Sequence, residues 1–308
     1  MEMEPEAEGL KEFETDLRAL WIASYPKSGN TWVRLFLSSY AFNKPADINS
    51  QSAVPYIRKY VYDSVAGDEI DHKDIRVFAL LKQAALWKQL QEIKVRPLVM
   101  KTHDIAAEIN GIPLFQPNLS MGAIYLVRDP RDVVISLSKH MGSTIDDTIA
   151  GMQEPSMVLT DENMAPNFIS SWDLNVNSWI KNTDVRNCHI LKYEELYDNP
   201  RDNFRRILEV VLDGHEIDEE RFEQALRSTG IKELQTQEEH SGFSEASKHG
   251  KFFEGGGGYG KWKTILTPEQ VFKIESVFAD TMEELGYELS LVDNNVIDLN
   301  KEIKNGTR

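Results

Sequence analysis

The sequence predicts an α/β fold in which a central parallel sheet is covered by helices on both faces. Two observations indicate this fold. Short apolar runs of the length of buried strands recur along the chain, and segments with a helical spacing of apolar residues lie between them. Strands and helices that alternate in this order form parallel sheets, in which the crossover helices cover the faces. Ligands of such sheets bind beyond the carboxyl ends of the strands.

Four segments are predicted to be the strands of this sheet. Each one is short and apolar and leads into polar or charged residues, as is typical of a buried strand. Their residue ranges are 19–25, 96–103, 122–129 and 188–196. The polar residues at the ends of these strands are the candidate site residues, namely Lys27, Lys101, His103, Arg128 and Tyr193.

Helices are predicted between these strands and after the last one. Segment 31–42 follows the first strand, 75–92 precedes the second, and Pro130 is placed to begin the next helix, because proline is favoured in a first turn. The glycine-rich segment 240–260 is expected to be a loop, and 141–165 a loop or a broken helix. Further helices are expected at 167–182, 201–212, 218–228 and 268–285.

We expect one domain over residues 18–290, between an acidic tail at 1–17 and an irregular tail at 291–308, because no repeat or linker divides the chain. A chain of 308 residues can bury a full core. It contains no run of about 18 apolar residues, and its first residues lack the basic and apolar regions of a secretory signal. Cys188 is the only cysteine, which excludes a disulfide within the chain and a cysteine-rich metal site. These observations predict a cytoplasmic protein without a membrane partner.

The charge balance limits the classes of ligand. With 34 Lys and Arg against 50 Asp and Glu, the formal net charge is −16. Nucleic-acid binding needs a basic surface, so no nucleic-acid partner is expected. The acidic balance either serves solubility or attracts a cationic substrate. An anionic ligand must therefore be held by a few local cations.

The segment YPKSGNTW (25–32) lies between the first predicted strand and its helix. Gly29 allows a tight turn and a close approach of the backbone to a ligand, and the start of the helix attracts anions through its N–H groups and its dipole. Lys27 adds a charge, and Ser28 and Thr31 add hydroxyls. The alternative is a plain strand–turn–helix with a surface lysine. The GxxxxGK[ST] spacing of nucleoside-triphosphate loops is absent, which disfavours a kinase or an ATPase.

The segment VRDPRDVVIS (127–136) ends the third predicted strand and begins a helix. Arg128 lies at the end of the strand and Ser136 lies about two turns into the helix, so both could contact one anion, to which arginine offers a fork of donors. The alternative is an ion pair of Arg128 with Asp129 or Asp132 and a serine on the helix surface.

The segment KTHD (101–104) ends the second predicted strand. A neutral imidazole at His103 could take a proton from an alcohol. The alternative is a structural role, which is the more common role of a single histidine. No two histidines have the spacing of metal ligands on a helix and HExxH is absent, so no metal site is predicted.

Taken together and in this order, the three clusters resemble the cytosolic-type sulfotransferases, which use the donor 3′-phosphoadenosine-5′-phosphosulfate (PAPS). The segments 170–179 (SSWDLNVNSW), 190–211 (ILKYEELYDNPRDNFRRILEVV) and 260–270 (GKWKTILTPEQ) also resemble that family, so the similarity extends over 18–285. It implies a P-loop-like α/β fold and metal-free transfer of a sulfuryl group to a hydroxyl or an amine of a small molecule. The product of the donor would be adenosine 3′,5′-bisphosphate (PAP). We expect a small-molecule enzyme of a bacterial type.

The resemblance also implies a role for each matching residue. Lys27 would neutralise the leaving 5′-phosphate, Lys101 would steady the transferring group, and His103 would be the general base on the acceptor. Arg128 and Ser136 would hold the 3′-phosphate. The other contacts with the donor would come from Ser28, Gly29, Asn30, Thr31, Trp32, Tyr193, Thr229, Phe253, Gly255, Gly256 and Gly257.

The donor loop departs from the pattern of the family. Where the family usually has Arg-Lys, this chain has Gly255 and Gly256, so the second clamp on the 3′-phosphate is missing from its usual position. Lys248, Lys251 or Lys261 could substitute for it. Otherwise the affinity for the donor is weak, or the loop becomes ordered only when ligands bind, since successive glycines lose much conformational entropy on ordering.

The acceptor pocket is expected between the segments 44–95, 141–168 and 240–258, whose Met and aromatic residues suit an adaptable apolar pocket. Two rival functions remain, a P-loop kinase with Asp104 or Asp129 on magnesium and a nucleotide-binding relative without activity. Acidic residues of the three segments would favour a cationic acceptor, such as an alkaloid, if they face inward; they are Asp63, Asp68, Glu69, Asp146, Asp147, Glu154, Asp161 and Glu162.

Overall fold

The structure is a computed structural model of the chain. The residues that it describes are 18–50, 53–67, 75–93, 97–109, 111–159, 165–181, 187–253 and 257–290. The predicted tails at 1–17 and 291–308 lie outside the described residues, as do Gly255 and Gly256 of the predicted donor loop.

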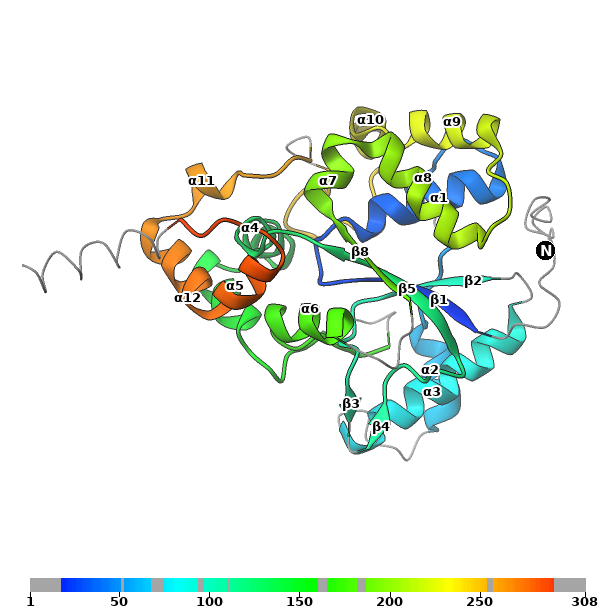
Figure 1. Cartoon of the computed structure of the whole chain (residues 1–308), viewed down its shortest axis with the longest axis horizontal. Helices are drawn as coiled ribbons and strands as arrows, with labels where there is room; N and C mark the ends of the chain where they lie inside the picture. The colour runs from blue at the N-terminus through cyan, green and yellow to red at the C-terminus, as the bar shows by residue number, and fades with distance from the viewer. Residues whose placement is uncertain are drawn as a thin grey trace, which may run out of the picture.

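The central sheet confirms the predicted parallel arrangement (Figure 1). Ala23 of the first strand lies opposite Thr102 of one neighbour and Tyr125 of the other. Because all the strands run parallel, their carboxyl ends lie at one edge of the sheet. The strands in their spatial order are β2 (Leu98–Thr102), β1 (Ala19–Ser24), β5 (Ser120–Val127) and β8 (Cys188–Lys192).

Successive residues of β1 point to opposite faces of the sheet and separate two cores. Leu20 and Ile22 pack in one core, and Trp21 and Ala23 pack in the other. The first core contains helices α1 (Asn30–Phe42), α8 (Pro200–Leu212) and α9 (Glu219–Ser228). The second core contains α2 (Lys59–Ala66), α3 (Ile75–Glu92), α4 (Pro130–Met141), α5 (Ile145–Met152), α6 (Trp172–Lys181) and α12 (Pro268–Glu284). Figure 1 shows α1, α8 and α9 above the sheet and α2, α3 and α6 below it.

The helices begin where the sequence supplies proline or a capping side chain. Pro130 stands in the first turn of α4, as predicted, and the Asp129 side chain before it accepts a hydrogen bond from the Arg131 backbone N–H. Thr267 and Gln270 form a capping box at the start of α12. The position of α4 matters for function, because this helix begins at the edge of the sheet where the strands end.

The fourth strand is shorter than predicted. The pattern predicts a strand over 188–196, whereas β8 ends at Lys192 and the next residues form α7 (Tyr193–Asp198). Lys192 is the last residue of β8 that pairs with β5, because β5 ends there and its chain continues into α4. Glu194 and Glu195 lie in the first turn of α7, where the helix dipole favours carboxylates.

Other differences concern short elements. The segment 141–165, predicted as a loop or a broken helix, contains α5, which is capped by the Thr144 side chain. The predicted helix over 167–182 begins only at Trp172, and its first two predicted residues, Asn167 and Phe168, pair as a strand instead. The other elements that the pattern did not predict are α2, β3 (Glu108–Ile109), β4 (Ile112–Pro113), β6 (Val158–Leu159), β7 (Asn167–Phe168), α10 (Ile231–Ser241) and α11 (Trp262–Ile265).

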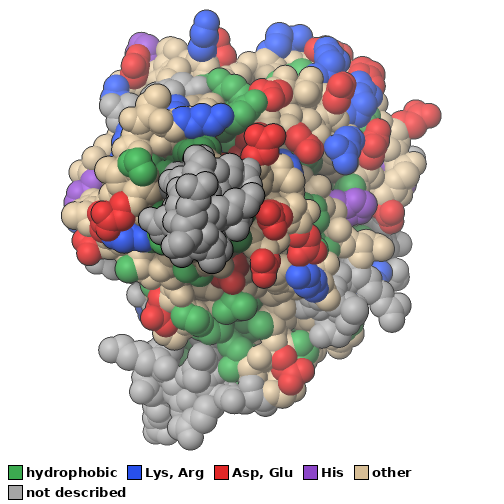
Figure 2. All heavy atoms as spheres, turned by 60° about the vertical axis from the view of Figure 1, so that its left-hand side comes forward, with side chains coloured by type: hydrophobic (Ala, Val, Ile, Leu, Met, Phe, Trp, Pro, Cys, Tyr) green, Lys and Arg blue, Asp and Glu red, His purple; other side chains and the backbone are tan. Residues whose placement is uncertain are grey.

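On the face seen in Figure 2, Lys and Arg side chains are interspersed with Asp and Glu side chains. Positive charge is therefore not gathered on this face. Within the described ranges, every helix is too short or too polar to cross a membrane.

Candidate active site

A cleft of about 830 Å³ lies at the carboxyl ends of the strands and brings most of the predicted site residues together. Lys27 and Arg128 both line it, and the Arg128 guanidinium donates a hydrogen bond to the Lys27 carbonyl (3.0 Å). These two predicted cations therefore face one ligand space. The other predicted residues that line the cleft are Gly29, Asn30, Thr31, Trp32, Lys101, His103, Ser136, Tyr193, Phe253 and Gly257.

The loop between β1 and α1 has the form of an anion-binding turn. Gly29 is the N-cap of α1 with φ of 99°, and no side-chain cap bonds to the first turn of the helix. A Cβ at Gly29 would lie 2.8 Å from the Tyr193 ring, so only glycine allows this packing. The Asn30 amide fixes the loop to β1 by donating to the Ile22 carbonyl (3.0 Å) and the Ser24 hydroxyl (3.3 Å).

Lys27 reaches the cleft from a strained backbone position. Its φ is 66°, which is uncommon for a residue with a side chain, and its ammonium lies 3.6 Å from the centroid of the Phe252 ring. Burial lowers the pKa of Lys27 to about 7, and the nearby Arg128 and Lys101 lower it further than the carboxylates around it raise it. An anion bound here would favour the charged form of this amine.

The hydrogen bonds of His103 determine which of its ring nitrogens can act as a base. Nδ1 lies 2.7 Å from the Ser24 carbonyl oxygen, which can only accept, so Nδ1 carries the proton. Nε2 is then left as the proton acceptor of the ring. Burial, followed by the charge of Lys101, holds the pKa of His103 well below its usual value, so the imidazole is neutral at pH 7. The Asn175 amide supports this position by donating to the His103 carbonyl (3.0 Å).

Arg128 joins three parts of the cleft wall. Besides its bond to the Lys27 carbonyl, its guanidinium donates to the Gly258 carbonyl (3.0 Å) and lies 4.3 Å from the centroid of the Tyr193 ring. Among the described residues its buried Nε has no hydrogen-bond partner. The predicted alternative, an ion pair with Asp129 or Asp132, is wrong. Asp129 is paired with Arg131 instead (2.7 Å), and the Asp132 carboxylate accepts hydrogen bonds from backbone N–H groups.

Two predicted donor contacts lie behind the cleft wall. The Ser28 side chain is fully buried, and its hydroxyl has no partner among the described residues. The Thr229 hydroxyl donates to the Ala225 carbonyl (2.7 Å) within its own helix end, while its carbonyl accepts a bond from the Trp32 indole (2.8 Å). Thr229 therefore holds Trp32 in place and does not itself line the cleft.

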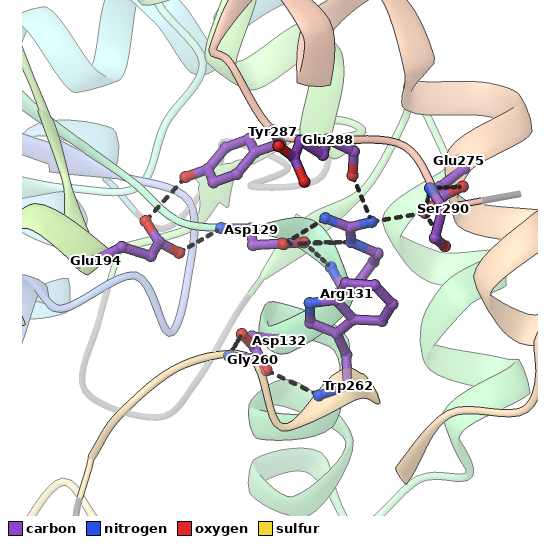
Figure 3. A network of polar contacts seen from close by, with 10 residues as sticks. All are labelled: Asp129, Arg131, Asp132, Glu194, Gly260, Trp262, Glu275, Tyr287, Glu288 and Ser290. Atoms are coloured by element: carbon purple, nitrogen blue, oxygen red, sulfur yellow. Dashed lines mark hydrogen bonds and ion pairs between the residues drawn. The ribbon is translucent and has the colours of Figure 1, made fainter. Parts of the chain in front are cut away.

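Asp132 fixes the segment that follows the predicted donor loop. Its carboxylate accepts hydrogen bonds from the backbone N–H groups of Gly260 (2.5 Å) and Trp262 (3.1 Å) (Figure 3). The Trp262 ring in turn lies 3.8 Å from the Arg131 guanidinium. Arg131 is buried and also bonds to Glu275 (2.6 Å). A closed network of charges thus anchors α4 and the segment over its first turn.

Further residues of the cleft were not predicted from the sequence. Glu245 pairs with the buried Arg34 (2.9 Å) and accepts a long hydrogen bond from Thr31 (3.5 Å). Burial alone would raise the pKa of Glu245, but Arg34 and Lys101 outweigh burial and lower it. Lys139 and His140 also line the cleft. Both follow Ser136 by three or four residues on the same helix, so they share its face. This spacing was the sequence signal that could have placed them in the cleft.

The acceptor end of the cleft contains few of the predicted acidic residues. Of the four that lie among the described residues, none lines the cleft: they are Asp63, Asp146, Asp147 and Glu154. Asp63 pairs with Lys59 on α2 (2.6 Å) and Asp146 with Lys273 (3.0 Å). The other four, Asp68, Glu69, Asp161 and Glu162, lie outside the described residues. Tyr56, Met141 and Leu159, from the segments expected to form the acceptor pocket, do line it.

A parallel sheet whose strand ends deliver a lysine, a histidine and an arginine to one cleft, beside a helix start without a side-chain cap, defines an α/β protein with a site for an anionic ligand. The chain belongs to the sulfotransferase family, because the family model described as "Sulfotransferase domain" matches residues 17–286. This confirms the resemblance found in the three sequence clusters.

Curated relatives and solved structures agree with this assignment. Sulfotransferase 1A1 of Canis lupus familiaris is 24% identical over 296 residues, which cover 91% of this chain and 88% of the relative. Cytosolic sulfotransferase 10 of Arabidopsis thaliana is 22% identical over 285 residues, which cover 90% and 81%.

Two solved structures share the fold at 18% identity. Retinol dehydratase in complex with androsterone and the inactive cofactor PAP has a TM-score of 0.58 and is covered to 81%, with 87% of this chain. Mouse sulfotransferase SULT7A1 complexed with PAP has a TM-score of 0.57 and is covered to 85%, with 88% of this chain.

Proposed function

We propose that this chain transfers a sulfuryl group from PAPS to a hydroxyl, or to an amine, of a small molecule. The observation that supports this most strongly is the convergence of Lys27, Lys101, His103 and Arg128 on one cleft beside the start of α1. Membership of the sulfotransferase family gives the class of reaction, and the solved relatives hold PAP.

The residues of the cleft fit a nucleotide with two phosphate groups. Six Lys or Arg side chains line it against two carboxylates, those of Asp132 and Glu245, in a chain whose net charge is −16. Both carboxylates accept hydrogen bonds within the protein, and the lining keeps a net excess of positive charge. The buried Arg128 Nε also lacks a partner among the described residues. Trp32 and Tyr193 offer aromatic surface for the base.

The chemistry follows from the positions of the base and the cations. Nε2 of His103 takes the proton of the acceptor, whose oxygen or nitrogen bonds to sulfur while the bond between sulfur and the 5′-phosphate oxygen breaks. Lys27 and Lys101 offset the negative charge on the departing phosphate and the transferring group. Catalysis of this kind depends on positioning and electrostatics, as in phosphoryl transfer.

The kinase alternative is not favoured by the positions of its two candidate magnesium ligands. Asp129 is buried in an ion pair with Arg131, and Asp104 is buried in an ion pair with Lys82. Neither lines the cleft that holds Lys27. The other rival, a nucleotide-binding protein without activity, would bind PAP but turn over no acceptor.

We also propose a cytosolic location and a small-molecule acceptor. The location is supported by relatives that are named cytosolic sulfotransferases. A small acceptor is supported by the solved relatives that hold androsterone or retinol beside PAP.

A pair of measurements tests this function. A ligand at 100 times its Kd stabilises a protein by about 2.7 kcal/mol, so PAP should raise the melting temperature more than ATP with magnesium does. Transfer of sulfate from PAPS to a panel of phenols, alcohols and amines should then proceed in the presence of EDTA. Larger stabilisation by ATP with magnesium would favour the kinase, and tight PAP binding without turnover of any acceptor would favour a binding protein.

A further inference from the structure

Five of the six cations that line the cleft fall into two groups, and the sixth is the exposed Lys248. Lys27 and Lys101 lie at the start of α1 and the end of β2, where each lowers the pKa of His103. The second group, called the α4 group here, consists of Arg128, Lys139 and Lys261, which line the cleft together with Ser136. Two cationic groups in one cleft suit a ligand with two separate anionic groups.

Lys261 belongs to a firmly held part of the chain. Its two neighbours, Gly260 and Trp262, both donate their backbone N–H groups to Asp132 on the first turn of α4. The Trp262 ring lies on the Arg131 guanidinium, which is itself buried among carboxylates (Figure 3). This places the backbone of Lys261 beside α4, and Lys261 lines the cleft together with Arg128 and Ser136.

The charges around Lys261 leave an excess of positive charge. Burial lowers its pKa, and Arg128 and Lys139 lower it further, whereas Asp132 raises it. The Asp132 carboxylate already accepts two backbone hydrogen bonds. A phosphate in this place would offset the charge of the α4 group.

The other two lysines that could replace the missing clamp fit less well. The Lys251 ammonium lies 3.7 Å from Glu239 at an exposed position, and Lys251 does not line the cleft. Lys248 lines the cleft but is exposed, and it lies three residues from Glu245. Only Lys261 combines a fixed backbone with a place beside Arg128.

We propose that Lys261, with support from Lys139, completes the binding site for the 3′-phosphate of the donor in place of the Arg-Lys pair that this chain lacks at Gly255 and Gly256. Arg128 supplies the fork of donors, Ser136 a hydroxyl, and the two lysines the remaining charge. This inference rests on the proposed function, since it concerns how the same donor is held. It makes Lys261 a residue that distinguishes PAP from a nucleotide without a 3′-phosphate.

Binding of PAP and of adenosine 5′-phosphate (AMP) to the full chain tests the inference. Calorimetry should show that Lys261→Ala raises the Kd of PAP about tenfold, which is about 1.4 kcal/mol, and changes the Kd of AMP less than about twofold. Lys139→Ala should act in the same direction but less, about threefold, because Lys139 is exposed. AMP binding also reports that each variant is folded.

The matched control is Lys263→Ala. It removes the same charge two residues away, but Lys263 does not line the cleft and lies 5.6 Å from the Trp262 ring. We expect its Kd values for PAP and AMP to match those of the unchanged chain. An equal loss of PAP and AMP affinity in Lys261→Ala, or no loss of either, overturns the inference and leaves the proposed function standing. If the unchanged chain binds PAP no more tightly than AMP, the proposal that PAPS is the donor is itself contradicted.

Discussion

Two groups of charges lie on either side of the first turn of α4, and they are organised in opposite ways. Behind the turn, Arg131 bonds to Asp129 and Glu275, and Glu275 also accepts hydrogen bonds from Ser290 (Figure 3). In front of it, in the cleft, the buried amine of Lys27 lies near other cations, and burial lowers its pKa.

The difference separates charges that stabilise the fold from charges that serve a ligand. A buried carboxylate or guanidinium is tolerated when its partners satisfy it, as they do behind the turn. The cleft instead keeps groups whose charge is favoured only when an anion is bound. We therefore expect substitutions behind the turn to lower the stability of the chain, and substitutions in the cleft to lower its activity.

The largest effect is expected at His103 in the cleft. Replacing it by alanine removes the proposed base for the proton of the acceptor, so kcat should fall by about 10²–10⁴-fold. The Kd of PAP should change little, because His103 does not belong to the two cationic groups. His189→Ala, an exposed imidazole on the edge strand β8, is the control and should keep full activity. A parallel loss of PAP affinity in His103→Ala would mean that His103 binds the donor instead.

The next largest effect is expected behind the turn, at Arg131. Arg131→Met leaves the buried carboxylates of Asp129 and Glu275 without their cation, which should lower the free energy of unfolding by about 3–5 kcal/mol. Arg205→Met is the matched control, because Arg205 forms a two-pronged but exposed ion pair with Glu219 (2.7 Å), so this variant should lose much less stability than Arg131→Met. Denaturant unfolding measures both. If both variants lose the same free energy of unfolding, the charges behind the turn do not stabilise the fold more than an exposed ion pair does.

A smaller effect is expected at Gly29, where the cleft depends on backbone shape. Gly29→Ala should lower the free energy of unfolding by about 1–2 kcal/mol, because its φ of 99° disfavours a side chain. The new Cβ would also press on the Tyr193 ring, against which Arg128 lies, so the Kd of PAP should rise on the order of tenfold.

The control for this substitution is Gly214→Ala. Gly214 also has a positive φ, of 86°, but no atom lies within 4 Å of its Cβ position. It should lose comparable stability while keeping its affinity for PAP. If both variants bind PAP equally well, the packing of Tyr193 on Gly29 has no part in holding the donor.

The strand ends were predictable because each combines a strong apolar run with a polar residue directly after it. Lys27, His103 and Arg128 were found in this way, and the parallel sheet then brings them together without further information. Tyr193 was predicted as a site residue although its backbone was assigned to a strand, and it does line the cleft. Its place on Gly29 depends on the end of β8, which is decided by pairing with β5 and not by local pattern.

The residues that were missed depend on contacts between distant segments. Arg34 appears in the sequence as one charge on an apolar helix, and its partner Glu245 lies more than 200 residues away in a segment without periodic pattern. Asp132 could be foreseen only as a neighbour of Arg128, since its bonds to Gly260 and Trp262 join two parts of the chain that no local signal connects. Local residue patterns thus located the edge of the sheet at which the cleft lies. The contacts that hold the cleft residues in place depend on pairing between distant segments.

The smallest expected effect is the pH dependence of PAP binding, which depends on whether Lys27 in the cleft is charged before the ligand binds. The pKa of Lys27 is lowered to about 7, because burial, Arg128 and Lys101 outweigh Glu245 and Glu238. PAP binds the charged ammonium, so above pH 7 binding must take up a proton. The Kd of PAP should therefore rise with pH by at most about tenfold per unit between pH 7.5 and 9. Phosphate groups are fully ionised in this range, since their second pKa is about 6.

Lys27→Arg isolates the contribution of this amine, because a guanidinium stays charged throughout the same range. In this variant the Kd of PAP should be constant from pH 7.5 to 9, even if it is larger at every pH. Calorimetry in two buffers of different ionisation enthalpy would show the uptake of a proton by the unchanged chain and its absence in the variant. A flat profile in the unchanged chain would mean that Lys27 is already charged before the ligand arrives. The cleft would then hold its cations as firmly as the network behind the turn holds Arg131, and the contrast between the two sides would fail.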